Sequence, residues 1–341
     1  MPNNKKEHKA MKKLTIMGLS AVSIATLLTL AACGGGGGDS SPSAPGGGSS
    51  SGGSTPPPSA SGGDVSPAQY AAGTAQKAIF DTINQQRQTC GFSALTENTL
   101  LDTASQAHAD YIGTNGGAIT DSEVAINPGF TGAGYADRAT HAGYPASTVF
   151  MGGESAGYWT NTTLSETAYG TNIATAWSSG VYHVGAFVWP VTQIGTGWNK
   201  TTVNGFPEAH GVITVANLKA TTGSTPLLFP CDGTTGVPFK VVGETPVPPN
   251  TNGTLGPTLA VAANPGDRVV LTSGTLIDTS GNVINLQVLN SVNDPNKLIQ
   301  SFEARAYSAT PLAPNTKYSA SLAGTINGTP FSRTGSFTTG S

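Results

Sequence analysis

Apolar side chains recur at helical spacing near the start of the folded part of the chain. Within residues 68–88, Ala75, Ile79 and Ile83 repeat every four residues, which predicts an amphipathic helix. The pair Ser66-Pro67 precedes this stretch and is typical of an N-cap followed by a first helical turn. We therefore expect the first helix to begin directly after Pro67.

A second helix is predicted after Thr96 and should stop at Asn115-Gly116-Gly117. His108 lies on its apolar face, so we interpret this histidine as a core residue with a satisfied hydrogen bond rather than as a catalytic group. The face consists of Leu100, Leu101, Ala104, Ala107, His108, Tyr111 and Ile112.

Two later stretches alternate in polarity from one residue to the next. Residues 191–196 and 210–218 have the period of strands, and Asn199-Lys200-Thr201 is the expected turn between them. A further helix is expected over residues 164–177. The mixture predicts an α+β region.

The chain beyond residue 245 has a different character. Residues 246–255 carry three prolines and predict a semi-rigid linker. Residues 256–341 contain short strands separated by turn signals, with Asn327-Gly328 as a strong hairpin turn. We predict a small all-β sandwich, with strands over residues 268–271, 275–278, 283–289, 299–307, 318–326 and 331–338.

The first 33 residues have the pattern of an export signal. Lysines precede a mostly apolar stretch over residues 14–31, and translation could start at Met1 or at Met11. The stretch ends in Leu30-Ala31-Ala32-Cys33, which matches a lipobox and predicts cleavage before Cys33 and its acylation. Gly34 after the cysteine favours the outer membrane of a Gram-negative bacterium. A transmembrane anchor is the alternative interpretation.

Composition then predicts a tether and limits the partners. Residues 34–66 are nearly all Gly, Ser and Pro, so we expect a disordered segment ahead of a domain over residues 67–245. Five of the 16 basic and one of the 19 acidic residues precede Cys33, which leaves 11 basic against 18 acidic and a net charge of about −7. Without a basic surface, nucleic-acid binding is not expected.

Two cysteines remain once Cys33 is acylated. Cys90 and Cys231 most simply form one disulfide in an oxidising compartment. Two separate buried thiols are the alternative.

An ordered set of motifs resembles bacterial CAP domains, where CAP denotes the cysteine-rich secretory, antigen-five and pathogenesis-related superfamily. The resemblance covers residues 70–245 and implies an α-β-α sandwich with a ligand cleft. The motifs are the Ala107-His108-Ala109-Asp110-Tyr111 helix, Asn127-Pro128-Gly129-Phe130-Thr131-Gly132, Asp137-Arg138-Ala139 with Gly143-Tyr144, Gly153-Glu154, and the stretch from Trp177 through His183 to Ile194-Gly195-Thr196-Gly197.

The resemblance also implies cleft residues. Two histidines and two acidic residues meet in the family's cleft, where Glu154 matches the first acid and His183 the second histidine. Asp121 and Glu123 stand where the first histidine is expected, and no acid follows Trp177 for the remaining position. We therefore expect residues 115–157 to form a binding loop, with Asp121, Glu123, Glu154 and His183 lining the cleft.

The chemistry of this set leaves several interpretations open. Glu154 could orient His183 as a general base, or the two could form a structural hydrogen-bonded pair. The set is a poor one for a divalent metal, so we assign no metal ligand and expect no cofactor, with a metal held by Glu154 and His183 as the less favoured alternative. Gly153-Glu154-Ser155-Ala156-Gly157 also matches the nucleophile elbow of serine esterases, with Ser155 as nucleophile, although so short a pattern arises often by chance.

These patterns predict an exported, lipid-anchored protein of the cell envelope. Its CAP domain should bind an extracellular lipid, sterol or wall component without catalysis. The alternatives are a hydrolase that uses His183 and Glu154, a serine esterase that uses Ser155, and a structural surface protein with an unused cleft. The C-terminal domain should be a spacer or a weak adhesion module similar to immunoglobulin-like or fibronectin-like domains.

Overall fold

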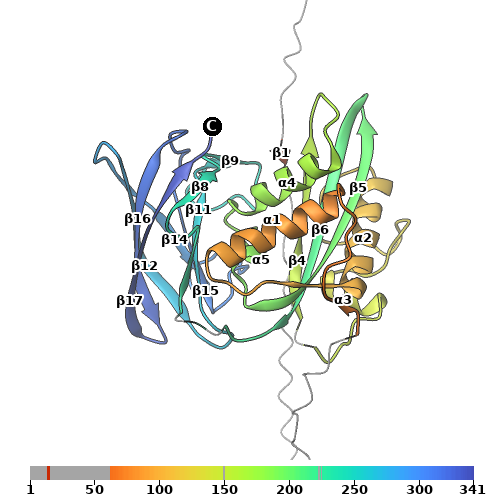
Figure 1. Ribbon diagram of the computed structural model, residues 1–341, viewed down its shortest axis with the longest axis horizontal. Coiled ribbons are helices and arrows are strands. Elements are labelled where there is room, and N and C mark those ends of the chain that lie inside the picture. Colours follow the sequence, from red (N-terminus) through yellow and green to blue (C-terminus); the bar gives the residue numbers. More distant parts are fainter. Residues whose placement is uncertain (1–13, 16–61, 149, 222, 224) are drawn as a thin grey trace, which may run out of the picture.

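The computed structural model describes residues 14–15, 62–148, 150–221, 223 and 225–341. The remainder of the expected signal and tether, including Cys33, lies outside these residues. The described chain is a mixed α/β region followed by a β-rich region with several sheets (Figure 1). No helix within the described ranges is long and apolar enough to cross a membrane.

A six-stranded sheet is the frame of the first region, in the order β1-β4-β6-β5-β3-β2. Its strands pair antiparallel except for β3 with β5. The strands are β1 (Leu14–Thr15), β2 (Asp64–Val65), β3 (Thr96–Asn98), β4 (Phe150–Trp159), β5 (Val191–Val203) and β6 (Phe206–Leu218).

Helices pack on this sheet. Helix α2 lies so close to β5 that a Cβ on Gly195 or Gly197 would come within 2.0–2.1 Å of the backbone of α2. Glycine at both positions therefore sets the distance between helix and sheet. The helices are α1 (Ala75–Thr89), α2 (Thr99–Thr114), α3 (Tyr135–His141), α4 (Glu166–Trp177) and α5 (Gly185–Val188).

The ends of the early elements differ from expectation. Helix α1 begins at Ala75, because the Thr74 side chain accepts the Lys77 N–H and caps the helix, so the expected start after Pro67 is wrong. Asp64 and Val65 belong to β2, and the Asp64 carboxylate accepts a hydrogen bond of 2.8 Å from Asn98. The ordered chain therefore begins before residue 67.

The hairpin of β5 and β6 also turns later than expected. Its turn residues are Asn204 and Gly205, both with positive φ, rather than the stretch at residues 199–201. Lys200 instead pairs with Ala209 inside the strands. An Asn-Gly pair suits such a two-residue turn, because both residues tolerate the left-handed conformation.

Three sheets form the β-rich region. The four-stranded sheet has the order β14-β15-β11-β7, the five-stranded sheet β13-β12-β16-β17-β8, and β9 pairs with β10. The strands are β7 (Leu227–Phe229), β8 (Thr234–Val237), β9 (Val241–Val242), β10 (Thr254–Leu255), β11 (Thr258–Ala262), β12 (Val269–Asp278), β13 (Val283–Asn285), β14 (Gln287–Asn290), β15 (Glu303–Tyr307), β16 (Lys317–Ile326) and β17 (Thr329–Thr339).

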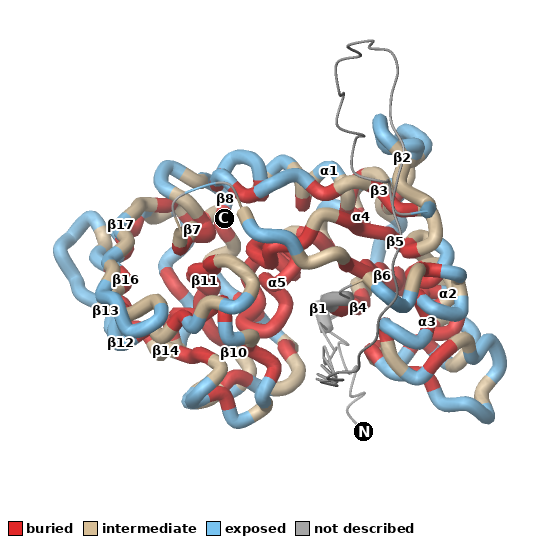
Figure 2. Tube along the Cα trace, turned by 90° about the horizontal axis from the view of Figure 1, so that it is seen from below, coloured by how far each residue is buried: buried red, intermediate tan, exposed pale blue. Residues whose placement is uncertain are grey.

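The expected boundary at residues 246–255 does not separate the two regions. Strand β7 precedes it but pairs with β11, and β8 precedes it but pairs with β17. Buried residues run on from α5 into β11 (Figure 2), and one apolar core joins Phe187 of α5 to Phe229 and Phe302. The β-rich region thus begins near residue 225 and packs directly on the first region.

Candidate functional site

Strand β4, which lies between β1 and β6 in the large sheet, carries the first two candidate residues. Glu154 and Ser155 pair with Ile213 and Val212 of β6, and adjacent residues of a strand point to opposite faces. The Ser155 hydroxyl lies 2.8 Å from the hydroxyl of Tyr135 on α3. Both Glu154 and Ser155 are buried.

This placement argues against the serine-esterase interpretation. Ser155 lies in the middle of a ten-residue strand rather than on a sharp strand-to-helix turn. Its hydroxyl contacts Tyr135 and interacts with the Asp121 carboxyl, and among the described residues it has no hydrogen bond to a histidine. Ser155 therefore lacks the histidine base that activates the nucleophile of a serine esterase.

Glu123 anchors the loop that precedes α3. Its carboxylate lies 2.9 Å from Nδ1 of His108 on α2 and accepts the backbone N–H groups of Thr131 at 2.6 Å and Gly132 at 3.2 Å. Burial alone would raise the pKa of Glu123, but these bonds and the charge of Arg138 lower it below its ordinary value. Glu123 therefore serves as an ionised structural anchor, and His108 is a core histidine with both ring nitrogens beside acceptors.

Asp121, two residues earlier, is held differently. Its Oδ1 accepts the Tyr135 hydroxyl at 2.5 Å, and its backbone carbonyl accepts Arg138 at 3.0 Å. Its Oδ2 is buried and has no hydrogen-bond partner. Burial raises the pKa of Asp121, and the Tyr135 hydrogen bond and the nearby His183 offset only part of this effect.

Glu154 has a similar environment on the other face of β4. One carboxylate oxygen accepts the Ala186 N–H at 3.2 Å, while Oε2 is buried without a partner. Burial raises the pKa of Glu154 well above its usual range, and the nearby Asp121 carboxyl adds to the rise. A carboxyl in this position holds its proton at pH values where an ordinary glutamate is ionised.

His183 is paired with a residue that the sequence did not suggest. It lies between α4 and α5, and its Nδ1 is 3.2 Å from Oε1 of Glu244. The same oxygen accepts the Tyr182 N–H at 2.6 Å. The expected pairing of His183 with Glu154 is not formed, because Glu244, which follows β9, supplies the carboxylate.

Strand β15 of the β-rich region also contacts the segment that carries His183. Arg305 on β15 donates from Nε to the Val181 carbonyl at 3.2 Å and from Nη2 to Glu303 at 2.6 Å. Its charge acts on Glu154 and lowers the pKa of that carboxyl, although less than burial raises it. The β-rich region thus completes the surroundings of the candidate residues.

Asp121, Glu154, His183 and Glu244 form what we call the acid–histidine cluster. Asp121 acts electrostatically on both Glu154 and His183, and His183 bonds Glu244. Each member has one buried polar atom without a partner, namely Asp121 Oδ2, Glu154 Oε2, His183 Nε2 and Glu244 Oε2. Such atoms are costly in a folded protein and are the ones a polar ligand would satisfy.

The cluster brings together three of the four predicted cleft residues. The fourth, Glu123, is not part of the cluster, because its carboxylate contacts His108 and the loop before α3. Across the described ranges, no group of three or more His, Cys, Asp and Glu side chains is arranged to hold a metal ion. Glu244 and Tyr135 were missed by the sequence analysis, since neither lies in a motif and Glu244 is 61 residues from its histidine.

Comparison with known proteins covers the first region. Residues 80–218 match the sequence model of the cysteine-rich secretory protein family, CAP. The match supports placing this region in the CAP superfamily, and it includes Asp121, Glu154 and His183 but neither Glu244 nor Arg305. No curated protein matches the chain.

Proposed function

We propose that this protein is exported, is held at the cell envelope by lipid on Cys33, and binds an extracellular ligand at the acid–histidine cluster without catalysing a reaction. A CAP domain suggests a ligand-binding protein of the extracellular type in general. We infer the CAP-type α-β-α sandwich for the first region and a small immunoglobulin-like sandwich for the second.

One observation carries the binding proposal. The cluster holds four buried polar atoms without partners, but Ser155 has no histidine beside it, and His183 is bonded to a carboxylate rather than to a nucleophile. Nucleophilic catalysis needs a nucleophile within hydrogen-bonding reach of a base. Ligand binding instead draws on unsatisfied donors and acceptors, and it needs no nucleophile.

The ligand classes that we propose are a sterol, another lipid or a wall component. The probes are cholesterol, palmitate and purified peptidoglycan, each tested for binding to the Cys33→Ser protein. We expect at least one probe to bind, and Asp121→Asn to weaken it about two- to tenfold, because a neutral amide no longer matches the ligand's hydrogen bonds. Asp81→Asn, an exposed change on α1, is the control. Failure of all three probes to bind would remove the proposal.

The anchor proposal rests on residues 30–33 and has its own test. Wild-type protein should sediment with membranes, and Cys33→Ser should move to the soluble fraction. Retention of the variant in the membrane with its signal uncleaved would favour a transmembrane anchor.

Hydrolysis in the same cluster is the second candidate function. Two observations support it. The raised pKa of Glu154 keeps a proton on the carboxyl at pH values where an ordinary glutamate is ionised, and Glu244 orients His183. A structural protein in which the cluster has no ligand is the third.

A further inference from the structure

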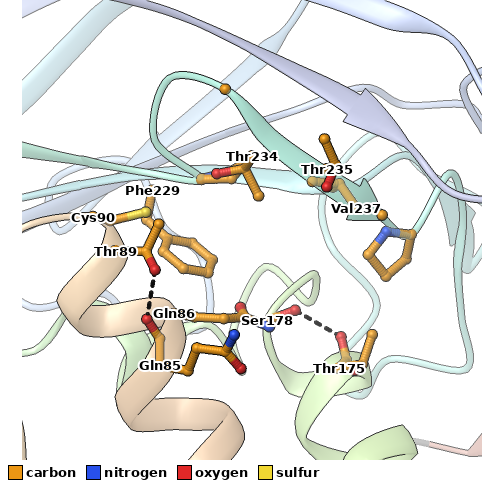
Figure 3. Close-up of a pocket in the computed structure, with 14 residues that line it drawn as sticks. Gln85, Gln86, Thr89, Cys90, Thr175, Ser178, Phe229, Thr234, Thr235 and Val237 are labelled. Carbon is orange, nitrogen blue, oxygen red and sulfur yellow. Dashed lines mark hydrogen bonds between the residues drawn. The ribbon is translucent and has the colours of Figure 1, made fainter.

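A second cavity lies away from the acid–histidine cluster, between the CAP region and the β-rich region (Figure 3). It has a volume of about 350 Å³, at the lower end of the roughly 300–1,000 Å³ common for small-molecule sites. One wall consists of the ends of α1 and α4, and β8 forms the wall across from it. No member of the cluster lines it.

The lining has no charge. Fourteen residues line the cavity, and none of them is Asp, Glu, Lys, Arg or His. A charged ligand would lose water there without gaining a counterion, which is costly. Phosphates, carboxylates and amines are therefore poor candidates.

The lining is nevertheless rich in hydrogen-bonding groups. The side-chain amides of Gln85 and Gln86 point toward the cavity from α1, and Thr235 faces them from β8 (Figure 3). Within the described part of the chain, these amides have no hydrogen-bond partner. Gln85 is exposed and Gln86 half-buried, so an apolar ligand would displace water from these amides without replacing its hydrogen bonds.

Apolar surface completes the cavity. The Phe229 ring and the Val237 side chain supply apolar surface at opposite ends of the cavity (Figure 3), and Pro238 also lines it. Amides and hydroxyls both donate and accept hydrogen bonds, as sugar hydroxyls do, while the ring and the aliphatic side chains suit the C–H faces of a sugar. The lining thus combines the two kinds of surface that a neutral sugar presents.

A covalent link holds the two walls together. Cys90 at the end of α1 forms a disulfide with Cys231, which lies between β7 and β8, and Cys90 itself lines the cavity. A site whose walls are tied before binding loses less entropy when the ligand enters. The cavity is therefore pre-formed rather than induced.

We propose that this cavity is a binding site for a neutral sugar unit of an extracellular glycan. The ligand lies with one face on Phe229 while its hydroxyls bond Gln85, Gln86 and Thr235. The site is separate from the acid–histidine cluster and does not depend on the function proposed for it.

The test is saturation-transfer NMR and calorimetry on the full-length protein in a detergent without sugar headgroups. The probes are glucose, galactose, mannose and N-acetylglucosamine, with glucuronate as the charged counterpart of glucose. We expect at least one neutral sugar to bind, and glucuronate to bind at least about fivefold more weakly than glucose, since its carboxylate finds no counterion.

Variants on α1 locate the site. Gln85→Ala and Gln86→Ala should each weaken sugar binding about two- to tenfold. Melting temperatures should change little, because Gln85 is exposed, Gln86 is half-buried and neither side chain bonds another described residue. Gln88→Ala, an exposed glutamine of the same helix that does not line the cavity, should bind as the wild type does. The proposal is overturned if no neutral sugar binds, if glucuronate binds as tightly as glucose, or if the Gln85 and Gln86 variants retain full affinity.

Discussion

Two buried histidines are each paired with a carboxylate from a distant segment. His108 on α2 meets Glu123 of the loop before α3, and His183 meets Glu244, which follows β9. All four side chains are at most 2 % exposed. Removing one partner from such a pair is costly, because the other remains buried and unsatisfied.

The first prediction concerns Glu244. Glu244→Ala should destabilise the fold by about 1–3 kcal/mol for each buried group that it leaves without a partner, namely His183 Nδ1 and the Tyr182 N–H. Urea denaturation measures the change. Glu166→Ala, an exposed substitution on α4, should cost less than about 1 kcal/mol. Equal losses in the two variants would show that the Glu244 contacts contribute nothing.

The second prediction uses the pH dependence of Glu154. Burial raises its pKa well above the ordinary value of 4.5, so the folded protein binds this proton more tightly than the unfolded chain does. Its contribution to stability is therefore complete below pH 4.5 and is lost as pH rises toward and through the folded pKa. Glu154→Gln removes this loss.

Urea denaturation between pH 4 and pH 8 measures this effect. The stability of Glu154→Gln relative to the wild type should rise steadily with pH, whereas Glu166→Gln should show no such trend. A constant difference between Glu154→Gln and the wild type at every pH would contradict the raised pKa.

The sequence predicted some of the individual site residues but not all of them. Family motifs located Glu154 and His183, and the apolar face of α2 indicated that His108 is a core residue. Sequence patterns did not identify Glu244, because its contact with His183 depends on the path of the chain after β8. Local patterns carry no information about that path. The same path brings Glu244, rather than Glu154, beside His183.

Among the elements, the disulfide and α1 hold the two regions together. The expected bond between Cys90 and Cys231 is confirmed and joins the end of α1 to the segment after β7 across 141 residues. It limits the unfolded chain by closing a long loop.

The third prediction is that Cys90→Ala/Cys231→Ala destabilises the protein by roughly 2–5 kcal/mol. Chemical denaturation under non-reducing conditions measures the loss. The wild type in reductant should lose a similar amount of stability. Reductant should not destabilise the double variant further. Unchanged stability in the double variant would show that the disulfide does not restrict the unfolded chain as expected.

Element boundaries followed sequence patterns unevenly. Alternation located β5 and β6 well, and Asn327-Gly328 forms the predicted turn between β16 and β17. The turn at Asn204-Gly205 has the same chemistry but was overlooked in favour of residues 199–201. Residues 66–74 do not form the expected helical turns because the Thr74 cap starts α1 later.

Over the whole molecule, the two regions share one core rather than a flexible joint. Thr258 donates its N–H to the Ser179 carbonyl at 3.0 Å, and the Tyr182 hydroxyl lies 3.0 Å from Asp294. The rings of Phe187 and Phe229 are 5.4 Å apart. Proline content alone predicted a linker at residues 246–255 because it gave no sign that β7 crosses to the second region.

The fourth prediction follows from this shared core. A chain cut after residue 255 should fail to unfold cooperatively, because it loses the strands that cover α5 and the partners of β7 and β8. Calorimetry of the full chain should show a single transition. A soluble truncated chain that melts within a few degrees of the full chain would mean that the first region folds alone.

Turnover is the most direct test of binding without catalysis. Purified protein is incubated with peptide, ester and peptidoglycan-fragment substrates, and product release is followed in the wild type, His183→Ala and Glu154→Gln. The account predicts no turnover above buffer in any of the three. Turnover in the wild type that falls about 10²- to 10⁴-fold in either variant, measured at a temperature where circular dichroism shows that variant to be folded, would contradict this expectation and identify a hydrolase.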